Sequence, residues 1–149
     1  MTDHAYWMQQ ALRLARQAES EGEVPVGAVI VLDDSIIGEG WNRPIKSADA
    51  TAHAEIQALR MACAKVNNYR IPGAIMYVTL EPCLMCAGAL IHARLQTLVY
   101  GADEPKTGAA GSNIDAFQLA NLNHRVKVEG GILAEECSLL LKQFFKSRR

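Results

Sequence analysis

The chain has 149 residues, half of them hydrophobic, so it is long enough to bury one sizeable core and short for two. Charged residues make up 21% and no low-complexity run divides the sequence, which argues against extensive disorder. The formal net charge of −1 excludes a globally basic nucleic-acid binder, so any contact with phosphates must come from local clusters. We expect a single domain over residues 1–149.

The amino-terminal segment, MTDHAYWMQQALRLARQ, mixes charged and apolar residues at helical spacing. It lacks the unbroken apolar run of a signal peptide and the length of a membrane span, so the cytoplasm is the expected location. Thiols stay reduced there. The four cysteines are therefore interpreted as metal ligands, catalytic groups or buried small side chains rather than as disulfides.

The first predicted elements are a helix and a hairpin. Apolar residues at helical spacing predict an opening helix that ends near Gly22. Two β-rich runs, VPVGAVIV and SIIGEGW, follow it and are joined by the short polar connection Leu32-Asp33-Asp34. They predict two antiparallel strands.

A second helix is predicted after Ala52, from a stripe of apolar residues that comprises Ile56, Leu59, Cys63 and Val66. Beyond a break at Pro72-Gly73, the runs AIMYVTL, CLMCAGALIHAR and LQTLVYG predict a strand, a helix and a parallel strand. A loop, a short helix near residues 115–121, a strand in RVKVEGGI and a closing helix complete the chain. These elements predict an α/β fold with three layers, α/β/α, around a mixed sheet of about five strands.

Two cysteines, Cys83 and Cys86, directly follow Pro82 at the expected start of a helix. Their spacing puts both sulfurs on one face of the first turn, beside unpaired backbone N–H groups that favour metal-binding thiolates. Such a pair alone also fits a redox dithiol, a structural zinc knuckle or coincidence. The other two cysteines, Cys63 and Cys137, fit apolar helix stripes and are interpreted as core residues.

Two sulfurs do not complete a tetrahedral zinc site, and His53, near the start of the second helix, is the candidate third ligand. Glu55 diverges from His53 on an ideal helix, so we expect it at the rim of the buried face, beside the metal rather than on it. A carboxylate held there suits a general base and acid for hydrolysis. Alone, His53 could be an ordinary solvated histidine and Glu55 a favourable first-turn acid. Together, His-x-Glu and Pro-Cys-x-x-Cys form the known signature of zinc-dependent nucleobase deaminases.

The chain resembles the bacterial tRNA-specific adenosine deaminases, which belong to the cytidine/deoxycytidylate deaminase-like zinc deaminases. The resemblance rests on VPVGAV, GEGWNRPI, TAHAEIQALR, YVTLEPCLMCAGALIHAR, KTGAAGS, NHRV and ILAEEC, spread over nearly the full length. It implies a cytidine deaminase-like fold and a cytoplasmic homodimer with one Zn²⁺ per subunit. It also implies conversion of the wobble adenosine in an arginine tRNA anticodon to inosine, by one zinc-dependent deaminase domain over residues 1–149.

The resemblance assigns roles to four of these residues. His53, Cys83 and Cys86 would be the zinc ligands, with the fourth position left for water, and Glu55 would shuttle protons between that water and the adenine.

Three further residues would form the base pocket. Asn42 matches the family's base-contacting asparagine, and its amide suits the N6 and N7 edge of an adenine. A loop-capping role fits Asn42 equally well. Val26 and Ala54 are small, lie near the same strand and helix ends, and would wall the pocket for an extruded base.

Contacts with the rest of the RNA are expected from four residues, namely Lys106, His124, Phe145 and Arg148. Cations at the carboxyl end could bind phosphates, and a ring could stack on a base. Alternatively, these cations only stabilise the C-terminus of a helix. Glu104 departs from the family, in which an aspartate is common at this position, and puts in doubt the contact of this loop with the nucleotide backbone.

Two other functions stay open at this point. Guanine and cytosine deaminases share both motifs, so a free base or nucleoside is an alternative substrate. A zinc-stabilised binding module without catalysis is a third interpretation. Glu55 argues against the binding module, because a purely structural site more often closes with a fourth sulfur or imidazole.

Overall fold

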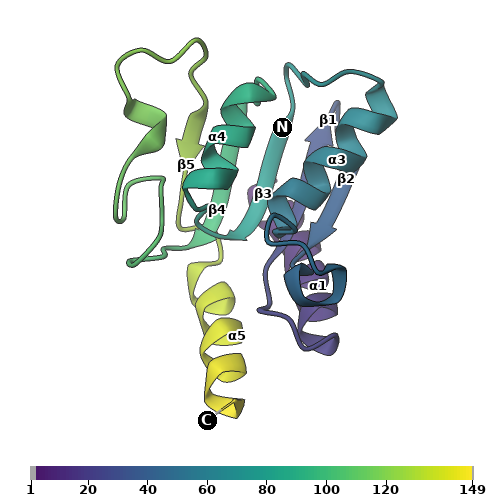
Figure 1. Cartoon of the computed structure of the whole chain (residues 1–149), viewed down its shortest axis with the longest axis vertical. Coiled ribbons are helices and arrows are strands. Elements are labelled where there is room, and N and C mark those ends of the chain that lie inside the picture. Colours follow the sequence, from purple (N-terminus) through teal and green to yellow (C-terminus); the bar gives the residue numbers. More distant parts are fainter. Residues whose placement is uncertain (1–2, 149) are drawn as a thin grey trace.

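Five strands form one mixed sheet with helices on both faces in the computed structural model, which describes residues 3–148 (Figure 1). The strands are β1 (Gly27–Leu32), β2 (Ser35–Trp41), β3 (Ile75–Leu80), β4 (Thr97–Ala102) and β5 (Lys127–Glu129). The helices are α1 (His4–Ser20), α2 (Pro44–Ser47), α3 (Ala54–Val66), α4 (Leu84–His92) and α5 (Ala134–Ser147), with a 3₁₀ turn, η1, at Ala116–Gln118. The predicted three-layer α/β/α fold is confirmed.

The strand order is β2-β1-β3-β4-β5. β1 pairs antiparallel with β2 and β3, whereas the β3–β4 and β4–β5 pairs are parallel. This arrangement confirms the predicted hairpin and the predicted strand–helix–strand unit. Asp33 and Asp34 close the hairpin with φ values of 51° and 58°, the left-handed pair that matches the twist of a two-residue hairpin.

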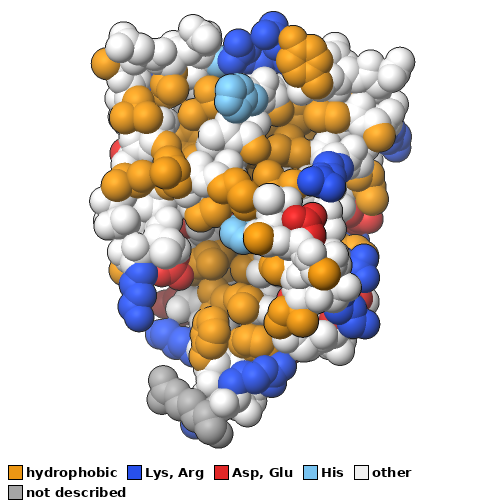
Figure 2. Space-filling view, in the orientation of Figure 1, with side chains coloured by type: hydrophobic (Ala, Val, Ile, Leu, Met, Phe, Trp, Pro, Cys, Tyr) orange, Lys and Arg blue, Asp and Glu red, His pale blue; other side chains and the backbone are white. Residues whose placement is uncertain are grey.

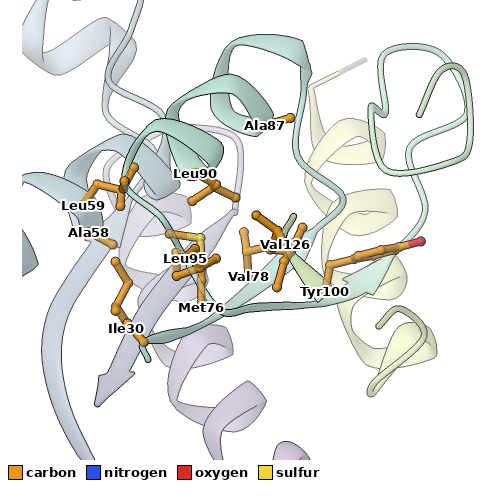
Figure 3. Packing of buried hydrophobic residues seen from close by; sticks show 14 of the residues in the cluster. Ile30, Ala58, Leu59, Met76, Val78, Ala87, Leu90, Leu95, Tyr100 and Val126 are labelled. Atoms are coloured by element: carbon orange, nitrogen blue, oxygen red, sulfur yellow. The ribbon is translucent and has the colours of Figure 1, made fainter. Parts of the chain in front are cut away.

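Successive side chains of each strand point to opposite faces of the sheet, which produces two separate cores. One core lies beneath α3 and α4 (Figure 3), and its strand residues include Ala28, Ile30, Met76, Val78 and Leu98. The other lies beneath α1 and α5, and its strand residues include Val29, Val31, Tyr77 and Val99. Cys137 is buried in this second core, as expected for a packing cysteine.

The buried stripe of α3 differs from the predicted one. Ile56 and Cys63 are only partly buried, and Val66 is exposed. Leu59 is buried as predicted, and the other buried residues of α3 are Ala54, Glu55, Ala58 and Ala62. The predicted helical period is correct, but the buried face of α3 is rotated by about one residue from the predicted face, toward the small side chains.

Two glycines of β2, Gly38 and Gly40, explain this rotation. A Cβ atom at Gly40 would lie 2.2 Å from the carbonyl oxygen of Ala54, and one at Gly38 would lie 2.3 Å from that of Ala58. The α3 backbone therefore rests directly on the strand, and only small residues fit at the contact. Size, rather than hydrophobicity, decides which side of α3 is buried.

Three local features also differ from the expectations. The one-turn helix α2 begins at Pro44 and was not predicted. The short helix expected near residues 115–121 is reduced to η1, and the last strand, β5, has only 3 residues. Within residues 3–148, no helix combines the length and apolar character needed to cross a bilayer.

Candidate active site and metal centre

The candidate site lies at the edge of the sheet where β3 and β4 end and where α3 and α4 begin (Figure 1). Because β1 runs antiparallel to its neighbours, Val26 before β1 and Asn42 after β2 lie at the same edge. Two helix N-termini therefore converge here, and their unpaired N–H groups favour negative charge.

The three predicted metal ligands come together at these helix starts. His53 is the N-cap of α3, Cys83 is the N-cap of α4, and Cys86 lies in the first turn of α4. Nδ1 of His53 is 3.6 Å from Sγ of Cys83 and 3.5 Å from Sγ of Cys86. All three atoms lie within 4.8 Å of one another, as the ligands of a single metal ion do.

The protonation states of these three side chains favour the binding of a metal cation. A hydrogen bond from the Cys86 thiol lowers the pKa of Cys83 to about 4, while the same bond and burial raise the pKa of Cys86. The pKa of His53 is raised by its hydrogen bond with Cys83, against the effect of burial. The two sulfurs thus share one proton, which a metal cation would replace. One imidazole and two sulfurs are a donor set suited to a soft or borderline metal ion.

Glu55 lies in the first turn of α3 and is not one of the three clustered ligands. Only 4% of its surface is exposed, and this burial raises its pKa to about 7. A carboxyl group with a pKa near the working pH exchanges a proton readily, which is what general acid–base catalysis requires. The sequence placed Glu55 at the rim of the buried face, whereas it lies within that face, because the alanine stripe of α3 includes it.

A cavity of about 140 Å³ opens beside these groups. Its lining includes His53, Glu55 and Cys83, and three apolar residues, Val24, Val26 and Leu80. Val26 thus lines the cavity, and its contact with a base stays a prediction. A larger surface hollow of about 560 Å³ lies beside β4 and α5 and is lined by none of the predicted metal ligands or Glu55.

Asn42 lines the cavity and also caps a helix. Its Oδ1 accepts a hydrogen bond of 3.2 Å from the N–H of Ala54, at the start of α3. The oxygen therefore caps a helix start rather than its own loop, and the contact of the Nδ2 amide with a base stays a prediction. Ala54 is fully buried and is not among the lining residues, so its expected role as a wall is wrong. Its backbone orients Asn42 instead.

The predicted RNA contacts lie in three places. Lys106 is exposed on the loop after β4, and its N–H donates to Oε1 of the cavity-lining Glu104 at 3.0 Å. Nε2 of His124 lies 2.6 Å from the carbonyl oxygen of Leu95, near the start of β4 and thus at the opposite edge of the sheet.

Phe145 and Arg148 are exposed near the end of α5, which projects beyond the sheet edge that holds the site (Figure 1). Phe145 lines a surface hollow of about 510 Å³ together with Lys142 and Lys146. The contacts of all four residues with RNA stay predictions.

Two buried carboxylates that the sequence patterns did not identify support the cavity. Glu23 accepts hydrogen bonds from the N–H groups of Ile45 and Lys46, at 3.3 and 2.8 Å, and so holds α2 in the segment after Asn42. Glu81 lines the cavity and binds the loop after β4. An acid between a buried strand and the Pro-Cys-x-x-Cys motif is the signal that could have identified Glu81.

Comparisons with known proteins agree with this geometry. The family model described as MafB19-like deaminase matches residues 2–149. The tRNA-specific adenosine deaminase of Haemophilus influenzae is 54% identical over 143 residues, which cover 95% of this chain and 83% of that protein. The guanine deaminase of Bacillus subtilis has a TM-score of 0.67 at 32% identity, over 98% of this chain and 95% of that one.

A solved structure from a study of A-to-I editing by tRNA:A34 deaminases at the wobble position of transfer RNA has a TM-score of 0.89. It is 45% identical in sequence, and the match covers 91% of this chain and 99% of that one. The chain therefore belongs to the MafB19-like deaminases and, within them, to the family of the tRNA-specific adenosine deaminases.

Proposed function

We propose that this chain hydrolyses the amino group of the wobble adenosine in an arginine tRNA anticodon, which yields inosine and ammonia. The observation that carries the proposal is the buried carboxyl group of Glu55, beside the His53, Cys83 and Cys86 cluster in one cavity. The 54% identity to a tRNA-specific adenosine deaminase supports the choice of substrate. Residues 1–149 act as one zinc-dependent deaminase domain, in the cytoplasm, where tRNA is processed.

Zinc is the metal that we propose for the cluster. Nδ1 of His53 and the two sulfurs form a donor set that zinc accepts, and three protein ligands are typical of a catalytic zinc site with an open fourth position. When bound, zinc lowers the pKa of a water molecule toward about 7, so that hydroxide is available near neutral pH. The N-termini of α3 and α4 stabilise the thiolate charge of Cys83 and Cys86.

Glu55 carries the proton chemistry. As a carboxylate it accepts a proton from the attacking water and donates that proton to N1 of the adenine as the oxygen bonds to C6. The same carboxylate then carries the proton left on that oxygen to the amino group, so the C6–N6 bond breaks, ammonia leaves and the carbonyl of inosine forms. Burial raises the pKa of Glu55, which makes its carboxylate a better proton acceptor.

Asn42 and Val26 position the base. Oδ1 of Asn42 already accepts the Ala54 N–H, so its Nδ2 amide donates, and the N7 acceptor of a purine is the matching group. Val26 supplies an apolar wall for the ring. A base in an anticodon loop is already partly unstacked, so its extrusion into the cavity costs less than extrusion from a duplex.

Outside the cavity, Lys106, Phe145 and Arg148 would contact the rest of the tRNA, as phosphate-binding cations and a stacking ring. They are exposed, and they lie on the loop after β4 and on the projecting helix α5. His124 has one ring nitrogen committed to the Leu95 carbonyl, so only its other ring nitrogen could meet RNA.

We also propose a homodimer that covers the face bearing α4. Hydrophobic side chains gather on this face (Figure 2), where Leu84 is 58% and Leu119 is 56% exposed. Both residues line a groove of about 260 Å³ beside Ile91. Apolar surface of this kind is stabilised when a second protein surface removes it from water.

The substrate is tested by incubating the metal-loaded protein with a tRNA anticodon stem-loop, adenosine, guanine and cytosine in parallel. We expect inosine and ammonia from the stem-loop only. Xanthine from guanine, without inosine from RNA, would instead favour the guanine deaminase activity to which the 32% identity also points. Metal analysis of the same sample should give one zinc ion per chain.

A further inference from the structure

Glu81 is a buried acid without a cationic partner. It follows β3, and 3% of its surface is exposed. No lysine, arginine or histidine among residues 3–148 forms an ion pair with it. A buried carboxylate of this kind is tolerated only where hydrogen bonds replace its lost hydration.

All of those hydrogen bonds come from the loop after β4. Oε1 of Glu81 accepts the N–H of Glu104 at 3.0 Å and the hydroxyl of Ser112. Oε2 accepts the N–H groups of Ala110 and Ser112, at 2.9 and 3.1 Å. A carboxylate offers about four lone-pair positions, and here the loop fills one with each donor. Glu81 thus has no acceptor left for a substrate, although it lines the cavity.

The loop wraps closely around this carboxylate. A Cβ atom at Gly108 would lie 2.5 Å from Cδ of Glu81 and 2.4 Å from the carbonyl oxygen of Glu104. Glu104 and Thr107, which belong to the same loop, line the cavity beside Asn42 and Glu55. The position of this cavity wall therefore depends on the Glu81 carboxylate.

We propose that Glu81 is a positioning residue that holds the loop from Glu104 to Ser112 as a wall of the substrate cavity, and that it thereby sets the affinity for RNA. The inference rests on the deaminase function proposed above. Glu81 acts through the loop, because its contacts are with loop donors and not with the metal ligands. Its loss should raise KM and leave the chemical step nearly intact.

The substitution Glu81→Gln tests this with little change in shape. An amide NH₂ in place of Oε2 would oppose two backbone N–H groups. In place of Oε1 it would oppose only the Glu104 N–H, because the Ser112 hydroxyl can rotate and accept instead. The amide will adopt this second orientation, so the damage falls on the Glu104 N–H, in the cavity wall. The unsatisfied N–H of Glu104 should displace the cavity wall and weaken the binding of RNA. We therefore expect KM for the stem-loop to rise about tenfold and kcat to change less than about threefold.

Ser112 offers a matched pair of milder variants, because its side chain is exposed apart from the hydrogen bond to Glu81. Ser112→Ala removes one of the four donors and should raise KM by about twofold to threefold. Ser112→Thr keeps the hydroxyl and should restore the wild-type KM. If Glu81→Gln fails to fold, this pair carries the test alone, and equal KM values for the two variants would then overturn the proposal.

Three measurements on the zinc-loaded protein separate the outcomes. In Glu81→Gln, the amide of Glu104 should exchange hydrogen faster than in the wild type, those of Ala110 and Ser112 should change less, and the zinc content should stay at one per chain. A lower kcat at unchanged KM, loss of zinc from a folded variant, or unchanged amide exchange would each overturn the role. If the wild type does not deaminate RNA, the proposed function fails separately, and the exchange measurement still decides whether Glu81 holds the loop.

Discussion

The two faces of the sheet share the same five strands but contribute differently to the site. The face under α3 and α4 supplies His53, Glu55, Cys83 and Cys86, and its contact with α3 is made of glycines and alanines. The face under α1 and α5 also has a close helix contact, at Gly27, but it supplies none of these four residues. On the first face, close packing of α3 on the sheet places the start of α3, with His53, beside Cys83 and Cys86. The second face supports the sheet without touching the candidate metal.

The largest effect expected from this division concerns Glu55. Glu55→Gln keeps the size of the side chain but removes the proton transfer, so kcat on the stem-loop should fall by about 10²–10⁴-fold. Folding and zinc content should be unchanged, because Glu55 is not in the ligand cluster. The control is the same substitution on the other face, Glu129→Gln, which should keep full activity. Full turnover by Glu55→Gln would disprove its catalytic role.

The second prediction concerns the pH dependence of stability in metal-free protein. Burial raises the pKa of Glu55 from 4.5 to about 7. As the pH rises from 4.5 to 7, the unfolded chain therefore loses this proton first, and the free energy of unfolding should fall by up to about 3 kcal/mol. Below pH 4.5 the group is protonated in both states and has no effect. Glu55→Gln should lack this decline, which urea titrations at several pH values would measure. Parallel pH curves for the two proteins would contradict the prediction.

A pair of glycine substitutions compares the two faces directly. A Cβ at Gly40 would lie 2.2 Å from the Ala54 oxygen of α3, and one at Gly27 would lie 2.0 Å from the Ala11 oxygen of α1. Both Gly40→Ala and Gly27→Ala should therefore lower the free energy of unfolding, by about 1–3 kcal/mol. Gly40→Ala should in addition weaken zinc binding, because it displaces the helix that begins after His53. Equal zinc affinities in the two variants would contradict this division.

The smallest expected effect concerns a polar network on the second face. Nδ1 of His4 lies 2.9 Å from the hydroxyl of Tyr77, and its Nε2 lies 2.8 Å from a carboxylate oxygen of Glu129. His4→Phe leaves the Tyr77 hydroxyl without this partner and should cost about 1 kcal/mol of stability. Thermal unfolding measures that loss, and kcat on the stem-loop should be unchanged. A clear drop in kcat would show that this face also affects the site.

The sequence predicted the parts of the fold that depend on hydrophobic pattern and on motifs. The stripes of α1 and α5, the hairpin at Asp33-Asp34 and the β3–α4–β4 unit all follow from periodicity and turn chemistry. The grouping of His53, Cys83 and Cys86 followed from ligand chemistry together with the position of two helix starts.

The features that were missed depend on size and on backbone partners. The buried side of α3 is set by the room above Gly38 and Gly40, which a hydrophobic pattern does not contain. Glu23 and Glu81 bind backbone N–H groups that are distant in sequence, and every residue type except proline supplies such a group. Ala54 was expected to act through its side chain and acts through its N–H instead.

The turn at Asp33-Asp34 has a practical consequence. It is exposed and joins β1 to β2 at the end of the hairpin opposite to Val26 and Asn42, the two cavity residues that flank these strands. Exposed loop tips of this kind accept inserted chain more readily than other positions. A fluorescent reporter or an RNA-targeting module could therefore be spliced into the polypeptide here, with the entrance for the nucleotide left clear.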